Sequence, residues 1–419
     1  MRRILRRIWP VWMSQPTYGI RFLIQRPIAR ARRRRAPRRF LIIPADLATL
    51  IGSRGDEAMM KALRDHLRAN YGDIQISVMS ECAQEELVFF GFERIRAQGA
   101  IPFDWKTRSA VLAFDAVFVI GADVLDGGYS VDWSLDMWSL AYRIAADGCP
   151  VTIAGFSMNE NVAAVIWDKI ARFPKGVRIN LRDPVSKRRF DAHCPGLAKL
   201  TADMAFALKP APPTAIPPRT ERWIQERKLA GDLVVGFNIN RHLIKDIPTL
   251  TVTKLVDGTV AVLSRLAQTR KISFLLIPHD VREASNDTAL LAELEDRLLP
   301  ELGELVHLAE GFHADGIKSL VGRMDAVITG RMHLAIAALG QGVPTLGINY
   351  NGKFEGLMEH FELPAWLVTT PRELCDDEGF VEVVNRFLAI RADLSSRIKA
   401  RLPEITALAE RNFLLPEWR

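Results

Sequence analysis

The segment 325–353 joins an apolar strand pattern to a basic turn and then to a helix pattern. The apolar run ends at Gly330, so Arg331 and His333 fall on the turn and on the first turn of the predicted helix. Backbone N–H groups at a helix start attract anions, and an arginine adds a forked donor. Histidine can deliver a proton near neutral pH, and Lys353 follows the next strand at the same sheet edge. We therefore expect a small polyanion to bind here, with His333 as general acid.

Two neighbouring carboxylates open an earlier predicted helix, directly after the glycine-bearing loop 52–55. Acidic residues at this position cap a helix and compensate its dipole, and they can also serve as a base at the edge of a sheet. The loop matches neither the Walker A pattern nor G-x-G-x-x-G. We expect Asp56 to act as base or to position a hydroxyl group, with Glu57 as the reserve candidate.

Arg182 follows the strand pattern 177–181, and His279 follows another apolar run that begins at residue 272. Both positions are strand ends, which favours a place in the same cleft, although a surface arginine–aspartate pair would contribute little. His313, near a short predicted helix, is a similar candidate to His279. The remaining histidines are expected to be structural or on the surface: His66, His193, His242, His307 and His360. No cluster with the spacing of metal ligands is visible, and no cofactor is expected.

These residues require a scaffold in which strands and helices alternate. Apolar strand patterns separated by helix patterns run from residue 40 and restart at residue 233, after five prolines in residues 210–218. Such alternation predicts parallel sheets covered on both faces, with ligands beyond the carboxyl ends of the strands. We predict an α/β fold with two Rossmann-like domains facing a cleft (GT-B-like). The expected parts are a basic tail (1–39), an acceptor-side domain (40–208), a proline-rich linker (209–232), a donor-site domain (233–370) and C-terminal helices (371–419).

The composition excludes several protein classes. The 419 residues are 48% hydrophobic and 25% charged, and four scattered cysteines include no C-x-x-C pair. A globular chain in a reducing compartment is therefore expected, rather than a disulfide scaffold or an integral membrane protein. The net charge of +7 arises from 13 arginines among residues 1–45, since the rest of the chain is mildly acidic. No nucleic acid is expected as a partner of the domains. The tail suits an anionic membrane surface, so we expect a cytoplasmic protein, peripheral on the inner face of the membrane, with a solvated arm as the alternative.

Several of these segments, in their order, resemble the polysaccharide pyruvyl transferase family. They are GDEA, IGADVLDGG, LRD-x-x-S, ADMAF and RMHLAIAALGQGVPTLGINYNGK, and the resemblance covers roughly residues 40–370. It implies transfer of the pyruvyl group of phosphoenolpyruvate to two hydroxyls of a sugar, free or lipid-linked, to give a cyclic ketal. It also implies an active-site set of Asp56, Arg182, His333 and Lys353. The chain departs from the family pattern at Gly121-Ala122-Asp123, where a glycine run is usual, and before Lys353, where Asp-Pro is usual.

Two other functions fit the same pattern. A GT-B glycosyltransferase would hold the diphosphate of a nucleotide sugar at the same helix start, but the only candidates for a carboxylate that holds the sugar ring are Glu355 and Glu359. A non-catalytic scaffold at the membrane would be favoured by loss of a motif residue, and none of the four is lost. Release of phosphate or of a nucleotide distinguishes the two enzymes.

Overall fold

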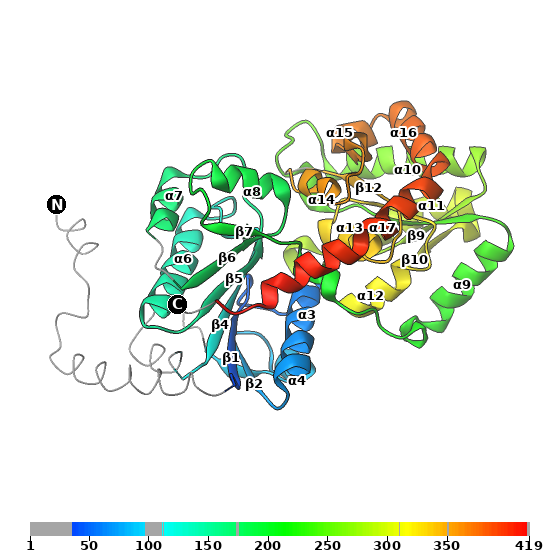
Figure 1. Cartoon of the computed structure of the whole chain (residues 1–419). Coiled ribbons are helices and arrows are strands. Elements are labelled where there is room, and N and C mark those ends of the chain that lie inside the picture. The colour runs from blue at the N-terminus through cyan, green and yellow to red at the C-terminus, as the bar shows by residue number, and fades with distance from the viewer. Residues whose placement is uncertain are drawn as a thin grey trace.

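The computed structural model describes residues 36–96, 111, 113–172, 176–309, 311–349 and 352–416. These residues form two α/β units, each built on its own sheet (Figure 1). All strand pairs within the two sheets are parallel. The predicted α/β fold with two Rossmann-like halves is confirmed. Nearly all of the predicted basic tail lies outside the described residues.

The first unit holds a seven-stranded sheet of order β3-β2-β1-β4-β5-β6-β7. Its strands are β1 (Arg39–Ile43), β2 (Gln75–Met79), β3 (Glu93–Ile95), β4 (Ala116–Ala122), β5 (Val151–Phe156), β6 (Val177–Leu181) and β7 (Ala198–Leu200). Its helices are α3 (Arg54–Tyr71), α4 (Gln84–Phe90), α6 (Val131–Ala146), α7 (Ala164–Ala171) and α8 (Pro184–Asp191), followed by the short η2 (Met204–Ala207).

The second unit holds a six-stranded sheet of order β10-β9-β8-β11-β12-β13. Its strands are β8 (Leu233–Asn238), β9 (Ile272–Leu276), β10 (Val306–Leu308), β11 (Ala326–Thr329), β12 (Thr345–Ile348) and β13 (Val368–Thr369). Its helical elements include η4 (Arg241–Ile244), α10 (Val252–Thr269), α11 (Asp287–Leu302), α12 (Ala314–Val321), α13 (Met332–Leu339), α14 (Phe354–His360), α15 (Pro371–Leu374) and α16 (Asp377–Ala389). Within the described ranges, each helix is too short or too polar to cross a bilayer.

Both faces of the first sheet are covered, which explains its unbroken apolar strands. In β1, Phe40 and Ile42 belong to one core cluster with α3, while Leu41 and Ile43 belong to another with α6. Figure 1 shows α3 and α6 on opposite sides of this sheet. Strand order reverses between β1 and β4 in the first sheet and between β8 and β11 in the second. Ligands bind at such switch points, beyond the carboxyl ends of the strands.

The range expected to be a linker contains a helix of the second unit. Helix α9 (Pro218–Leu229) begins with proline in its first turn, where the missing N–H group is not needed and the fixed φ favours a helix. Trp223 of this helix is buried and donates its Nε1–H to the Glu304 carbonyl at 2.8 Å. The prolines therefore begin a helix that packs on the second sheet, so the range 209–232 is not an open linker throughout.

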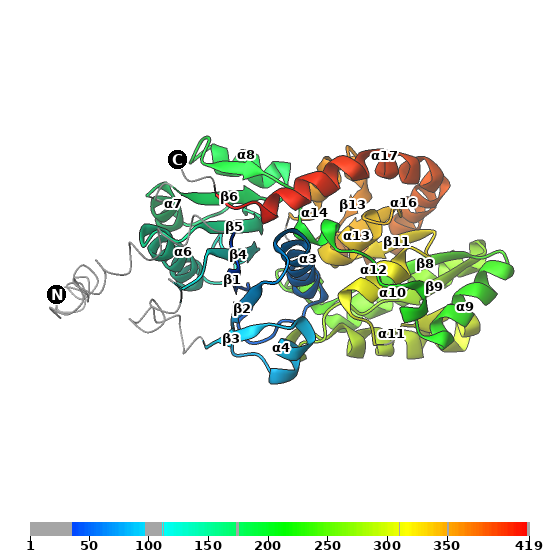
Figure 2. The ribbon, with the colours of Figure 1, turned by 60° about the horizontal axis from the view of Figure 1, so that its bottom comes forward.

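The last helix returns to the first unit. Helix α17 (Arg391–Glu410) runs from the second unit across to the first sheet, and both views show this path (Figures 1 and 2). It ends in η8 (Arg411–Phe413), where the buried Asn412 accepts from the Gly155 N–H at 2.9 Å and donates to the Ala202 carbonyl at 2.8 Å. The C-terminal helices thus link the two units.

Candidate active site

A cleft of about 760 Å³ lies between the two units, at the carboxyl ends of their strands. Its walls come from the segments after β1, β4 and β6 in the first unit and after β8, β9, β11 and β12 in the second. These segments include both switch points. Six of the seven predicted site residues line this cleft, namely Asp56, Arg182, His279, Arg331, His333 and Lys353. The seventh, Glu57, is not among the lining residues.

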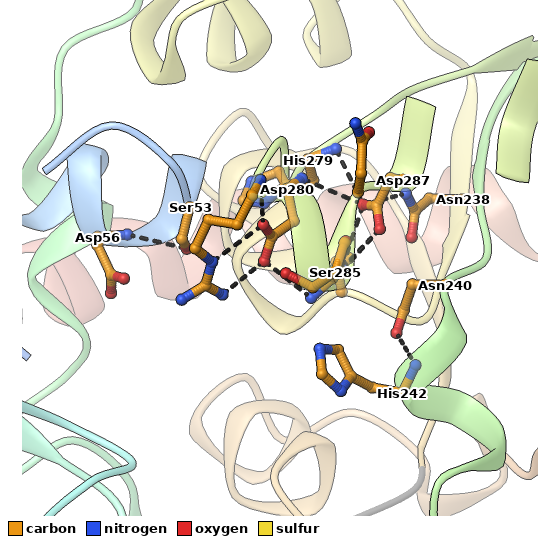
Figure 3. Close-up of polar contacts among 12 residues, drawn as sticks. Ser53, Asp56, Asn238, Asn240, His242, His279, Asp280, Ser285 and Asp287 are labelled. Carbon is orange, nitrogen blue, oxygen red and sulfur yellow. Dashed lines mark hydrogen bonds and ion pairs between the residues drawn. The ribbon is translucent and has the colours of Figure 1, made fainter. Parts of the chain in front are cut away.

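Asp56 lies in the first turn of α3, which starts at Arg54 because the Ser53 side chain caps it. The Ser53 hydroxyl accepts from the Asp56 N–H at 3.4 Å (Figure 3). Burial raises the pKa of Asp56 from 3.8 to about 6, although His333 and Arg282 act against this rise. A carboxyl group with this pKa can gain and lose a proton close to neutral pH.

His333 lies in the first turn of α13, directly opposite the start of α3. Its imidazole ring packs against Gly55, and a Cβ atom built on that glycine would overlap the ring. The Nε2 atom lies 3.4 Å from the Asp203 carboxylate, which follows β7. Burial acts to raise the pKa of Asp203, but His333 and Arg182 hold it well below its usual range. The two helix starts therefore bring Asp56 and His333 to one point of the cleft.

Arg331, at the N-cap of α13, is held by two carboxylates of its own unit. It donates through Nε and a terminal nitrogen to Asp287, with distances from 2.6 to 3.2 Å. A further contact of 3.3 Å reaches Asp280, and the Ser285 carbonyl accepts at 2.9 Å. Figure 3 shows Asp280, Ser285 and Asp287 close to one another. The guanidinium predicted to bind an anion is therefore fixed in place by buried acids.

The other two predicted cations also have carboxylate partners. Arg182, only 3% exposed, donates to Asp203 at 2.9 Å and to the Ser157 hydroxyl at 2.7 Å. Lys353 reaches across the cleft and pairs with Asp123, which follows β4. Burial acts to raise the pKa of Asp123, but Lys353 and Arg182 hold it well below its usual range. The Lys353–Asp123 pair thus joins the second unit to the first.

His279 lies behind His333 in the floor of the cleft. The two rings are parallel within 5°, with centroids 6.5 Å apart. Burial lowers the pKa of His279 well below 6.5, and the neighbouring His333 and Arg331 add to this effect. Its carbonyl accepts from the Arg54 N–H at 3.1 Å, so the start of α3 is hydrogen-bonded to the second unit here. His279 therefore lines the cleft beside His333.

Residues 54–352, which include most of this cleft, match the family model described as polysaccharide pyruvyl transferase. The chain belongs to the polysaccharide pyruvyl transferase family. Among curated protein sequences, none matches it.

Solved structures similar to this family member share its two-domain GT-B-type fold. Anabaena Alr3699/HepE in complex with UDP-glucose has 14% identity and a TM-score of 0.56, over 89% of this chain and 98% of the other. A putative UDP-N-acetylglucosamine 2-epimerase from Listeria monocytogenes has 14% identity and a TM-score of 0.55, over 90% and 95%. A glycosyltransferase from Rickettsia africae has 12% identity and a TM-score of 0.55, over 90% and 95%. At such identities the similarity concerns the fold alone.

One departure from the family pattern is visible in the backbone. Ala122 stands where a glycine run is usual, and it adopts a φ of +43° at the end of β4. This region of φ favours glycine, and a residue with a side chain stays there only when its surroundings hold it. The preceding Gly121 has no room for a side chain, because a Cβ atom would overlap Phe156. The turn that leads to Asp123 is therefore constrained on both sides.

Glu57 points away from the cleft, although it follows Asp56 directly. Its fully buried carboxylate contacts Arg54 at 2.8 Å, His313 at 3.1 Å and Lys61 at 3.2 Å. It also accepts from the N–H of Ala314, the first residue of α12, at 3.1 Å. Adjacent residues on a helix face directions about 100° apart, which separates the two carboxylates. Glu57 therefore binds α3 to the second unit through His313 and Ala314.

Sequence reasoning missed several residues of the cleft. His242 after β8 lines it, although it was expected to be structural or on the surface. Arg282 pairs with Asp280 at 2.6 Å and, across the cleft, with Asp46 at 3.3 Å. The position of Asp280 and Arg282 within three residues of His279 was the signal that could have identified them. Among the residues that the structure describes, no three histidine, cysteine or acidic side chains are grouped as a metal ion would require.

Proposed function

We propose that this protein transfers the pyruvyl group of phosphoenolpyruvate to two hydroxyl groups of a saccharide, forming a cyclic ketal and releasing phosphate. The observation that carries the proposal is the meeting of Asp56 and His333 at two opposed helix starts, in a cleft that also holds four basic side chains. Family membership supports the reaction class. The geometry supplies a proton donor, a proton acceptor and cations in one place.

The donor carries a phosphate and a carboxylate, and the second domain offers the groups that bind them. Arg331 lies at the start of α13, which has no side-chain cap, so first-turn N–H groups can meet an anion. Lys353 and Arg282 are held across the cleft by Asp123 and Asp46. An anionic donor would compete with these two carboxylates. Arg331 and Arg182, whose partners are more deeply buried, would keep their positions.

The reaction requires one proton on carbon and one loss of phosphate. His333 delivers a proton to the methylene carbon, which gives the central carbon positive character, and a sugar hydroxyl attacks that carbon. Asp56 accepts the proton of the attacking hydroxyl, which suits its pKa of about 6. The second hydroxyl then displaces phosphate at the same carbon, and its proton leaves with the products. Two C–O bonds to the sugar form, and the C–O bond to phosphate breaks.

A donor-binding experiment tests the proposal. Phosphoenolpyruvate should raise the melting temperature of the protein, whereas UDP-glucose should not, and addition of a saccharide acceptor should release inorganic phosphate. His333→Gln serves as the matched control, since the amide can hydrogen-bond but cannot protonate carbon. Stabilisation by UDP-glucose alone would instead favour a glycosyltransferase, a function that the complex of Alr3699/HepE with UDP-glucose makes worth testing.

We further propose that the arginine-rich residues 1–39 hold the enzyme at the anionic inner face of the cytoplasmic membrane, near lipid-linked acceptors. Thirteen arginines without a single acid would be attracted to such a surface. Deletion of residues 1–38 should abolish sedimentation with phosphatidylglycerol vesicles and leave phosphate release in solution unchanged. Equal sedimentation of the full-length and truncated proteins would remove this role.

A further inference from the structure

The two walls of the cleft differ in chemistry. Among the described residues that line the cleft, the second domain contributes arginines, a lysine and three histidines, whereas the first domain contributes one basic side chain, Arg182, which is bound to Asp203. The first-domain wall instead carries carboxylates, hydroxyls and two aromatic rings. The anionic donor fits the second-domain wall, which leaves the polar and aromatic wall of the predicted acceptor-side domain (40–208) for the saccharide.

We propose that the loop after β4, residues 123–133, is the binding site for a pyranose ring of the acceptor saccharide. We call it the acceptor loop. Trp133 would stack on the apolar face of the sugar, while Asp123 and Ser130 would hydrogen-bond its hydroxyl groups. This assignment rests on the proposed pyruvyl transfer, which requires a hydroxyl-bearing acceptor beside the donor. Aromatic rings combined with a few fixed polar groups are the composition that suits a ligand with both apolar and hydroxyl-bearing faces.

Trp133 lies between the core of the first domain and the cleft. It lies in the first turn of α6, where its N–H donates to the Ser130 hydroxyl at 3.2 Å. Its side chain is half-buried, packing against the core cluster of the first domain while lining the cleft. Because the core supports one side of the ring, a sugar can stack on it without a large loss of side-chain freedom.

The acceptor loop is held rigidly by buried polar side chains. Asp126, only 2% exposed, accepts from the N–H groups of Gly128 at 2.8 Å and Asn159 at 3.0 Å. The buried Ser134 hydroxyl accepts from the Gly127 N–H at 3.0 Å and donates to the Val124 carbonyl at 2.5 Å. This network, which the donor reaction does not need, fixes the loop before any ligand arrives.

The second domain reaches the same loop from across the cleft. The Tyr129 ring, 55% exposed, has the ammonium groups of Lys245 and Lys353 at 5.4 and 5.6 Å from its centre. Its hydroxyl donates to Asp123 at 2.9 Å. Lys353 therefore touches both the proposed donor site and the acceptor loop, which puts the sugar hydroxyls and the donor side by side.

Saturation-transfer NMR tests the proposal without any donor present. The probes are methyl β-D-galactopyranoside, methyl β-D-glucopyranoside and methyl α-D-mannopyranoside with the full-length protein. We expect at least one probe to bind, and Trp133→Ala to weaken its affinity about tenfold or more. Trp133→Phe should retain part of the affinity, because it keeps an aromatic face. Trp366→Ala is the matched control, since this half-buried ring packs under Arg386 outside the cleft.

The outcomes separate this inference from the proposed function. No binding of any probe by the wild-type protein, or equal binding by wild type and Trp133→Ala, would overturn the acceptor loop assignment. Circular dichroism of both tryptophan variants checks that the fold is retained, and Trp133→Phe keeps the test decisive if the alanine variant does not fold. The proposed function fails independently, if phosphoenolpyruvate neither stabilises the protein nor releases phosphate.

Discussion

Replacing Asp56 with Asn should stabilise the protein and inactivate it at the same time. Burial raises the pKa of this carboxyl from 3.8 to about 6, so the folded state holds the proton more tightly than the unfolded chain. Between pH 4 and 6 the folded state therefore binds more protons, and stability falls as the pH rises through this window. Above pH 6 the ionised Asp56 lowers the free energy of unfolding by at most about 3 kcal/mol. The actual loss is below this limit, because the side chain is partly open to the cleft. Asp56→Asn should recover about 1–3 kcal/mol at pH 7.

Urea unfolding at pH 4 and pH 7 measures the effect on stability. The gain should be present at pH 7 and small at pH 4, where Asp56 is protonated in the folded state and about half protonated in the unfolded chain. In wild type, kcat/KM should fall on the acid side with an apparent pKa near 6, whereas Asp56→Asn should lose this limb and about 10²–10⁴-fold in turnover. Asp46→Asn is the control, because removal of that neighbouring charge lowers the pKa of Asp56 and moves the limb to lower pH. If Asp56→Asn is less stable than wild type at pH 7, or if it keeps the acid limb of the pH profile, the reasoning is refuted.

Further predictions concern the neighbouring residues. His333→Gln should lower turnover about 10²–10⁴-fold while calorimetry still detects phosphoenolpyruvate, whereas Arg331→Ala should weaken donor affinity by about 1.5–3 kcal/mol. Gly55→Ala should displace the His333 ring and cost about 10²-fold in turnover, with circular dichroism unchanged; near-normal turnover would show that the ring position is unimportant. Ala122→Gly should raise the free energy of urea unfolding by about 1 kcal/mol, and a loss would contradict strain at this turn. Burial acts to raise the pKa of Glu57, but His313 and its basic neighbours hold it below 4.5. Glu57→Gln should therefore cost about 1.5–3 kcal/mol at pH 7 and progressively less as the pH falls below 4.5, measured by the same unfolding assay.

The strand positions were predictable because both sheets are covered on both faces. Buried parallel strands appear as short apolar runs, and residues 177–181 coincide with β6. Helix α9 lies within the range expected to be a linker, since proline both interrupts chains and begins helices. The sequence alone could not assign α9 to the second domain, because the contact that identifies this assignment, between Trp223 and Glu304, spans 81 residues.

The candidate site was predictable as a set of strand-end positions but not as a set of contacts. His333 and Asp56 could be placed at the cleft because each begins a helix after a strand. The ion pair of Arg331 could not be predicted, because its partner Asp287 lies 44 residues away along the chain. The roles of Glu57 and Asp56 could not be distinguished from the sequence. The distinction depends on α12, which lies against the other side of α3 and binds Glu57. Local sequence gives the direction of a strand, whereas the partner of a charge depends on tertiary packing.

The return of α17 has a consequence for biosynthesis. Residues 36–208 are synthesised first. The Gly155 N–H and the Ala202 carbonyl gain their hydrogen bonds to the Asn412 side chain only after residue 412 has been made. Phe413, which is 1% exposed, is likewise buried in the core only after it has been synthesised. A nascent first domain would expose this part of its surface to chaperones or to other chains until residues 412 and 413 have been made. Synthesis of the C-terminal segment is therefore the step that completes the first domain, more than 200 residues after its own last strand was made.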